Sequence, residues 1–299
     1  MHVAETLLNK SEELVFRELT SIASDNALRL FAKPRLSDVI VKDRRLMQRE
    51  FDFYTRAHVD FVLADATTKP IMIIEYDGPF HETAYQQERD QIKDALCVEA
   101  DLGILRINAN HVTRLYRGIT VLRWVVEVSE LQRWFDKAQA DGRVPYDEPF
   151  DPAMISDDGS GRKWPYWLSA STTQAINSFM RKLARDIPKG SAGIIGTDQA
   201  GNGHRLSFLW FGDRLLWAKT AVRKQHIDFP SYDLLQELAT CELGIKLSKF
   251  RRGELEAISI NRFQHIHDEF CDKFNAHINH SWGYPFEYNW GSVFATQAG

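Results

Sequence analysis

The sequence has little cysteine and no long apolar run. Its 299 residues include three cysteines, Cys97, Cys241 and Cys271, which are far apart and form no C-x-x-C pair. This spacing argues against a disulfide framework and a cysteine zinc site, and it fits a reducing compartment. No stretch of about 18 uncharged apolar residues occurs, and the first residues lack the basic and apolar regions of a signal peptide. We therefore expect a cytoplasmic protein without a membrane segment.

An excess of positive charge is also missing. The formal net charge is −4, so the composition as a whole does not indicate a nucleic-acid-binding protein. Residues 29–56 are a local exception, because they contain eight basic and four acidic residues and so carry a net charge of +4. A basic segment of this kind is most often solvated surface. Arg44 and Arg45 within it become candidates for substrate binding only if a functional site lies nearby.

Apolar residues are plentiful, at 44% of the chain, with 12% aromatic residues. A chain of this length and composition can form about two domains with their own cores. Residues 141–165 are rich in Pro, Gly, Asp and Ser, which indicates an interdomain linker. We therefore predict a first domain over residues 1–140 and an α+β accessory domain of unknown role over residues 166–299.

The predicted second domain mixes helices with a hairpin. Helical periods occur near residues 171–187, 231–249 and 261–278, and a hairpin is expected to turn at Gly212 and Asp213. Two histidines, at 265 and 267, invite a metal-site interpretation, but residues i and i+2 of a helix face different directions, so this interpretation is weak. The sequence does not define what this domain binds.

The first domain has a more informative pattern. Its predicted elements, in chain order, are a helix over 5–23, a strand or two and a long basic loop over 28–54, strands over 59–64 and 71–76, a helix over 83–100, a strand over 103–108 and a long helical region over 112–140. In the helix over 83–100, Ile92, Ala95 and Leu96 are expected to face inward. This alternation of helices and strands predicts an α/β fold.

One acidic residue lies on the apolar stripe of the first predicted helix. The stripe consists of Leu8, Glu12, Val15, Leu19 and Ile22. A buried, unpaired carboxylate is costly, so Glu12 either lies at the edge of the stripe in water or is directed at a cation. Both interpretations are open for Glu12 alone, and the acids on the strands favour the second.

The two predicted strands at the centre of the domain carry acids where a core strand should have none. Asp60 lies in the first apolar run, and Glu75 and Asp77 lie in the second. Side chains alternate along a strand, so Glu75 and Asp77 share a face roughly 7 Å apart, and a neighbouring strand can bring Asp60 to them. Three carboxylates this close cost stability unless a divalent cation lies between them. The pattern therefore predicts a metal site.

The order of these elements, with D-x14-E-x-D across the central strands, resembles the PD-(D/E)xK nuclease superfamily. The closest likeness is to the very-short-patch-repair endonuclease type and to related uncharacterised bacterial domains. The matching pieces, within about residues 5–110, are Ile74-Glu75-Tyr76-Asp77-Gly78, His81, Asp90-x-x-Lys93 and Leu105-Arg106. Each short motif is weak alone, but their order and spacing together are fairly specific.

The resemblance implies a restriction-endonuclease-like core, a mixed sheet flanked by helices, and a Mg²⁺-dependent (or Mn²⁺-dependent) endonuclease that hydrolyses phosphodiester bonds, with DNA as the expected substrate. It makes Asp60 and Glu75 the metal ligands, with Glu12 holding a second cation or a metal-bound water. Hard carboxylate oxygens suit both metals. Arg106 is expected to clamp a phosphate or, alternatively, to pair with Asp77 or Asp90. A role in bacterial DNA defence, repair or mobile-element biology rests on the resemblance alone.

The chain departs from the superfamily pattern two residues after Glu75. These families usually place a lysine there to orient the nucleophilic water, whereas this chain has Asp77. Lys93 could reach the site from the following helix, or His81 could act as general acid or base near neutral pH. We favour His81 as catalytic and Lys93 as a supporting charge, with Asp77 as an extra ligand or as the residue that orients His81. A structural role for His81, and an exposed helical pair of Asp90 with Lys93, are the alternatives.

The departure at Asp77 keeps other functions open. A non-catalytic member of the same fold could serve as a nucleic-acid or protein docking module, which the acidic composition also favours. A metal-dependent hydrolase of another phosphoester is a more distant alternative. In the nuclease hypothesis, the second domain supplies target recognition, oligomerisation or regulation.

Overall fold

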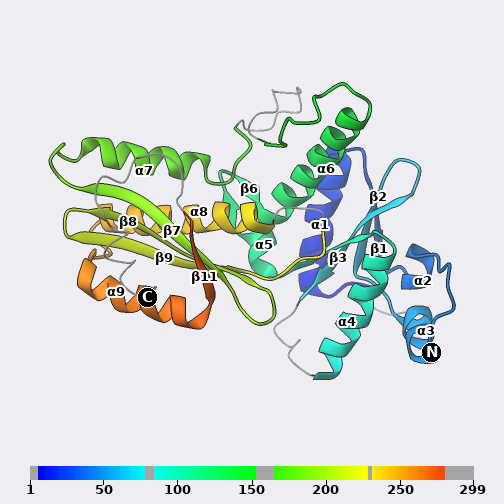
Figure 1. The fold of residues 1–299 in the computed structure, drawn as a ribbon. Coiled ribbons are helices and arrows are strands. Elements are labelled where there is room, and N and C mark those ends of the chain that lie inside the picture. The colour runs from blue at the N-terminus through cyan, green and yellow to red at the C-terminus, as the bar shows by residue number, and fades with distance from the viewer. Residues whose placement is uncertain (1–5, 78–83, 153–164, 228–230, 280–299) are drawn as a thin grey trace. The chain divides into compact units, whose positions relative to one another are not determined.

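The computed structural model describes residues 6–77, 84–152, 165–227 and 231–279, with the backbone alone for 84–87, 231 and 275–279. The chain forms two compact units. The first unit comprises Met1–Tyr166 and Gln225–Pro230, and the second comprises Trp167–Lys224 and Ser231–Gly299. Each unit contains a sheet covered by helices (Figure 1).

The first unit is built on a four-stranded mixed sheet in the order β1-β2-β3-β4. The strands are β1 (Arg29–Ala32), β2 (Phe61–Ala64), β3 (Pro70–Tyr76) and β4 (Gly103–Ile107). The β1–β2 and β2–β3 pairs are antiparallel, and β4 runs parallel to β3. A parallel pair needs a crossover, which the helix between β3 and β4 provides. The first unit is therefore α/β, as the alternating pattern predicts.

Helices and one short hairpin complete the first unit. They are α1 (Lys10–Asp25), α2 (Leu36–Val39), α3 (Gln48–Arg56), α4 (Ala84–Glu99), α5 (Ala109–Thr113), the hairpin of β5 (Leu115–Tyr116) and β6 (Ile119–Thr120), and α6 (Val121–Ala140). The first helix begins after a capping box, in which the Asn9 side chain accepts from the Glu12 backbone and the Glu12 side chain accepts from the Asn9 backbone. The cap therefore fixes the start of the helix and the position of Glu12 in its first turn.

One face of this sheet packs against α4. Val62, Ile73 and Ile104, which lie opposite one another on three neighbouring strands, form a buried cluster with Leu96 and Cys97 of α4. Side chains alternate between faces along a strand, so residues two positions further along each strand point to this same face. The next row of side chains on the α4 face, beside the row of Val62, Ile73 and Ile104, therefore lies at the edge of the core, where polar groups can be placed.

The other face of the sheet packs against α1. Val15, Leu19 and Ile22 of this helix are fully buried, and Phe16 contacts Phe61 of β2 with ring centroids 6.3 Å apart. The predicted apolar stripe is thus confirmed from Val15 to Ile22. Glu12, one turn earlier, lies at the end of the stripe.

A short segment from late in the sequence belongs to the first unit. His226 forms a bridge with Ile104 of β4, with N–O distances of 2.6 and 3.3 Å. The Gln225 side chain accepts from Arg106 N and donates to Arg106 O. The chain therefore returns to cover the free edge of β4, which the predicted domain boundaries do not include.

The second unit contains a five-stranded antiparallel sheet in the order β10-β9-β8-β7-β11. Its strands are β7 (Lys189–Thr197), β8 (Gly203–Phe211), β9 (Arg214–Val222), β10 (Ile258–Ser259) and β11 (Asn275–Asn279), and its helices are α7 (Ala170–Lys182), α8 (Ser231–Arg251) and α9 (Ile260–Lys273). One face carries Phe208 and Trp210 against Phe263 of α9, and the other carries Leu209 and Leu216 against α7 and α8. No helix in the described ranges is both long and apolar enough to cross a membrane.

Several predicted elements are confirmed and others need correction. The hairpin of β8 and β9 turns at Gly212 and Asp213, as predicted. The helical region expected over 112–140 is broken by β5 and β6, because Arg117 and Gly118 both adopt positive φ and make a tight turn. Ala95 is exposed on α4, whereas Lys93 is buried there. The predicted helix over 261–278 ends at Lys273, and the rest of that range continues into β11.

Candidate active site

Charged residues form one row across the sheet of the first unit. Glu75 and Arg106 are paired in the β3–β4 register. Asp60 lies one residue beyond the Phe61–Ile74 pair of β2 and β3, and therefore opposite Glu75. Lys33 lies one residue beyond the Ala32–Phe61 pair of β1 and β2, and its backbone N–H donates to Asp60 O at 2.8 Å. One charged residue thus lies at this level on each of β3 and β4, at the position directly after β1 and at the position directly before β2.

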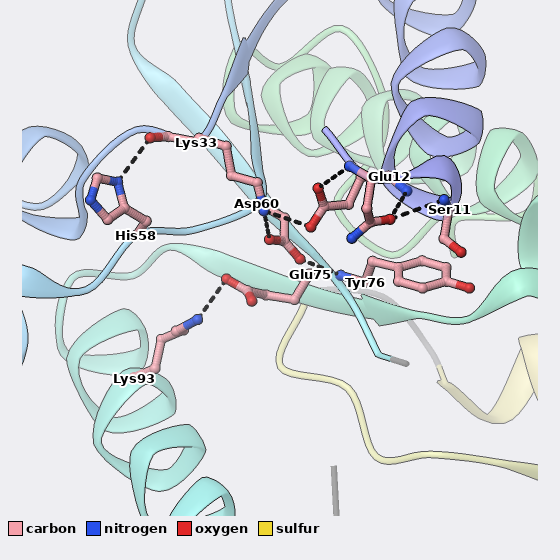
Figure 2. Close-up of polar contacts among 9 residues, drawn as sticks. Ser11, Glu12, Lys33, His58, Asp60, Glu75, Tyr76 and Lys93 are labelled. Carbon is pink, nitrogen blue, oxygen red and sulfur yellow. Dashed lines mark hydrogen bonds and ion pairs between the residues drawn. The ribbon is translucent and has the colours of Figure 1, made fainter. Parts of the chain in front are cut away.

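At one end of the row, a single ammonium group contacts two carboxylates (Figure 2). Lys33 Nζ lies 2.7 Å from Glu12 Oε1 and 2.6 Å from Asp60 Oδ1. Burial alone would lower the pKa of Lys33, but its hydrogen bonds to Asp60 and Glu12 outweigh that effect and raise the pKa. Glu12 is therefore directed at a cation, and in this structure the cation is Lys33.

Asp60 and Glu75 are neighbouring carboxylates at the centre of the row. Asp60 Oδ2 accepts a hydrogen bond of 2.9 Å from the Tyr76 backbone N–H. Lys93 Nζ, from α4, lies 2.7 Å from Glu75 Oε1, as Figure 2 shows. Burial raises the pKa of Glu75 and the charge of Asp60 adds to the rise, while Lys93 opposes it. The Asp60–Glu75 pair therefore has two lysines, one on each side.

At the other end of the row, Arg106 is buried and forms an ion pair with Asp94. Its Nη2 lies 2.6 Å from Asp94 Oδ1 of α4, and only 3% of its side chain is exposed. Burial alone would lower the pKa of Arg106, but Asp94 raises it, with smaller contributions from Asp90 and Asp77. His226 Nε2 lies 3.4 Å from the other oxygen of Asp94. The Arg106 guanidinium thus belongs to a group of ion pairs centred on Asp94. Clamping of a phosphate by Arg106 stays a prediction.

The other residues predicted for the site lie outside the charged row or outside the described residues. Asp77 directly follows β3, and its backbone N–H donates to Ile107 O at 2.7 Å. His81 lies outside the described residues. Arg44 forms a bidentate ion pair with Glu99 of α4, with an Nε–Oε1 distance of 2.5 Å and an Nη2–Oε2 distance of 2.8 Å. Arg45 is exposed. Substrate contact by Arg44 and Arg45 stays a prediction, and the first of them would have to exchange Glu99 for a phosphate.

A divalent ion is compatible with part of this arrangement. Across the described ranges, no group of three or more His, Cys, Asp and Glu side chains is placed to hold a metal ion. Mg²⁺, however, is commonly bound by one or two carboxylates together with waters and substrate phosphates. Asp60 and Glu75 are two largely buried carboxylates at neighbouring positions of the sheet, so their chemistry fits such an ion. Glu12 is separated from this pair by Lys33, which contacts both Glu12 and Asp60.

Two residues of the site were not identified from the sequence. Lys33 is one of many basic residues in the 29–56 segment. Its place in the row depends on the register between β1 and β2, and these two strands are separated in the chain by a long insertion that contains α2 and α3. Asp94 follows the recognised Asp90-x-x-Lys93 motif directly, and a helical spacing of four from Asp90 places both acids on one face of α4. That spacing is a signal that the sequence contains.

Comparison with known proteins adds one finding. A family model described as "Protein of unknown function (DUF2726)" matches residues 4–121. This range includes α1, the four-stranded sheet and α4, and so contains every member of the charged row and its partners Glu12, Lys93 and Asp94. No curated protein and no solved structure matches the chain.

Proposed function

We propose that the first unit is a metal-dependent nuclease that hydrolyses phosphodiester bonds, with DNA as its expected substrate. The observation that carries the proposal is the pair of opposed carboxylates, Asp60 and Glu75, with the Lys93 ammonium 2.7 Å from Glu75. The order α1-β1-α2-α3-β2-β3-α4-β4, with β3 parallel to β4, gives a mixed sheet with flanking helices, and this supports the restriction-endonuclease-like core that the sequence resemblance implies. Topology alone supports many activities, so the proposal depends on the site.

The residues of the site suit phosphodiester hydrolysis. A divalent ion held by Asp60 and Glu75 would supply charge neutralisation and a bound water of lowered pKa. Lys93 is anchored by Glu75 in a largely buried position, where its ammonium can hold a water or an anionic oxygen close to the carboxylates. In this proposal, Lys93 takes the role that the lysine two residues after the glutamate has in the nucleases that the sequence resembles. His81 remains the alternative proton-transfer group.

Plasmid nicking tests the proposal. The protein is incubated with supercoiled DNA and Mg²⁺ or Mn²⁺, and Asp60→Ala should abolish conversion to the nicked or linear form. Asp136→Ala is the matched control, because Asp136 is an exposed aspartate of α6 in the same unit. Undiminished cutting by Asp60→Ala would show that this row is not the active centre.

Two further variants distinguish the candidates for the missing lysine. If Lys93 holds the reacting water, Lys93→Met should reduce the nicking rate by roughly 100-fold or more, and His81→Ala should have a smaller effect. The opposite ranking would assign the proton transfer to His81. Both variants should be compared at saturating metal, so that a loss of metal affinity is not counted as a loss of chemistry.

A non-catalytic docking module is the second candidate, and one observation favours it. Lys33 and Lys93 already form ion pairs with the acids Glu12, Asp60 and Glu75, so two of these three negative charges are compensated without a metal ion. A protein that binds DNA without cutting it under any metal condition, and whose Mn²⁺ affinity is unchanged in Asp60→Asn, would favour the docking function.

A further inference from the structure

Lys33 has an unusual backbone conformation. Its φ is 55°, in the left-handed region that residues with a Cβ rarely adopt. Both of its backbone polar groups are engaged, since its N–H donates to Asp60 O and its carbonyl oxygen accepts from His58 Nδ1 at 3.0 Å. Strained positions of this kind persist where the surrounding structure enforces them, often at functional sites. The structure therefore holds Lys33 in a defined place beside Asp60.

The Lys33 ammonium contacts the atoms that a metal ion would need. Asp60 Oδ2 accepts a hydrogen bond from the Tyr76 backbone N–H, and Lys33 Nζ lies 2.6 Å from the other oxygen, Oδ1. The ammonium therefore occupies space beside a carboxylate that could also bind a cation. A divalent ion bound to Oδ1 would lie within about 4 Å of the ammonium, where like charges repel each other strongly outside bulk water. Lys33 and a divalent ion therefore compete for Asp60.

The two lysines of the site differ in their freedom to move. The Lys33 side chain is 34% exposed, whereas the Lys93 side chain is 10% exposed. A partly exposed ammonium can rotate into water at little cost, but a buried ammonium that leaves its carboxylate loses a compensating charge without gaining water. Lys33 is therefore the lysine that would leave, and Lys93 would remain with Glu75.

We propose that Lys33 is a built-in counter-cation, which occupies part of the divalent-ion position at Asp60 and swings out when the ion binds. This proposal rests on the proposed function of the Asp60–Glu75 pair as a metal centre. Lys33 reduces the repulsion between the carboxylates of Glu12 and Asp60 in the metal-free protein by contacting both, and it weakens the binding of metal. Its role is to regulate metal loading of the site, and it takes no part in the chemistry.

Isothermal titration with Mn²⁺ in the absence of nucleic acid tests this competition. Lys33→Met should bind Mn²⁺ roughly tenfold more tightly than the unmodified protein, because the competing charge is gone. Lys69→Met is the matched control, since Lys69 is an exposed lysine in the turn between β2 and β3 of the same unit. Lys33→Arg keeps the charge and should not tighten binding. Circular dichroism establishes that each variant is folded, and Lys33→Gln replaces Lys33→Met if the latter does not fold.

The outcomes separate this proposal from the proposed function. Equal affinities of the unmodified protein and Lys33→Met, with binding lost in Asp60→Asn, would overturn the counter-cation and leave the metal centre intact. Equal tightening by Lys33→Met and Lys69→Met would also overturn it, because the effect would then be a long-range charge effect. If no variant binds Mn²⁺ in a manner that depends on Asp60, both proposals fail.

Discussion

The two units treat buried charge differently. In the first unit, the buried Arg106 has the carboxylate of Asp94 as its partner, and its pKa is raised. In the second unit, Arg205 of β8 is equally buried, and its Nε donates to the hydroxyl of Ser207. Burial lowers the pKa of Arg205, and its hydrogen bond with Tyr232 opposes this change. One arginine is thus held by an opposite charge and the other by neutral dipoles.

Glu237, a buried acid of the second unit, also differs from the paired acids of the first unit. Glu237 of α8 accepts hydrogen bonds of 2.8 Å from both the backbone N–H and the hydroxyl of Ser169. Burial raises the pKa of Glu237 to about 7, although these bonds oppose the rise. Isolated charges in the second unit are therefore pushed towards their neutral forms. In the first unit, opposite charges are concentrated in one row, which is the arrangement expected where charge must be kept for a function.

The largest expected effect on stability follows removal of Asp94. Asp94→Ala leaves Arg106 buried without its main partner, so the free energy of unfolding should fall by about 3 kcal/mol. Urea unfolding of the purified variant measures this loss, with the exposed Asp136→Ala as a control that should change little. A loss below about 1 kcal/mol would show that Asp77 and Asp90 compensate Arg106 without Asp94.

The pH dependence of stability should reflect Glu237. The pKa of Glu237 is about 7 in the folded protein, against an ordinary value of 4.5 for a glutamate in water. Between these two pH values, the folded protein therefore binds more protons than the unfolded protein. Stability should therefore decrease as pH rises, by about 2 kcal/mol between about pH 5 and about pH 8. Glu237→Gln should remove most of this decrease in urea unfolding. A decrease of equal size in the variant would mean that Glu237 is not the group that titrates.

The smallest expected effect is that of replacing Arg205. Arg205→Met removes a buried charge that has no carboxylate partner, so the free energy of unfolding should change by less than about 1 kcal/mol, or increase. Arg106→Met is the paired measurement, and it should destabilise the protein, because Asp94 then loses its partner. A larger loss for Arg205→Met than for Arg106→Met would contradict the contrast between the two units.

Much of the architecture could be predicted from periodicity. The buried face of α1, the strands β2, β3 and β4, and the β8–β9 hairpin all follow from apolar spacing and turn residues. The helix α3 (Gln48–Arg56) was not predicted, because its apolar residues lie among charged ones in the basic segment. β7 (Lys189–Thr197) was also missed, since its glycines and serine weaken the strand pattern. Local patterns therefore located the strongly amphipathic elements and missed the weak ones.

The sequence by itself determined the acids of the candidate site. Alternation along β3 placed Glu75 on a defined face, and the adjacent β2 brought Asp60 opposite it. Only the tertiary structure decided which cations accompany these acids. Lys33 reaches Asp60 through the pairing of β1 with β2, across an insertion of two helices, and Lys93 reaches Glu75 because α4 packs on that face. Contacts between distant segments depend on register and packing, which local spacing does not encode.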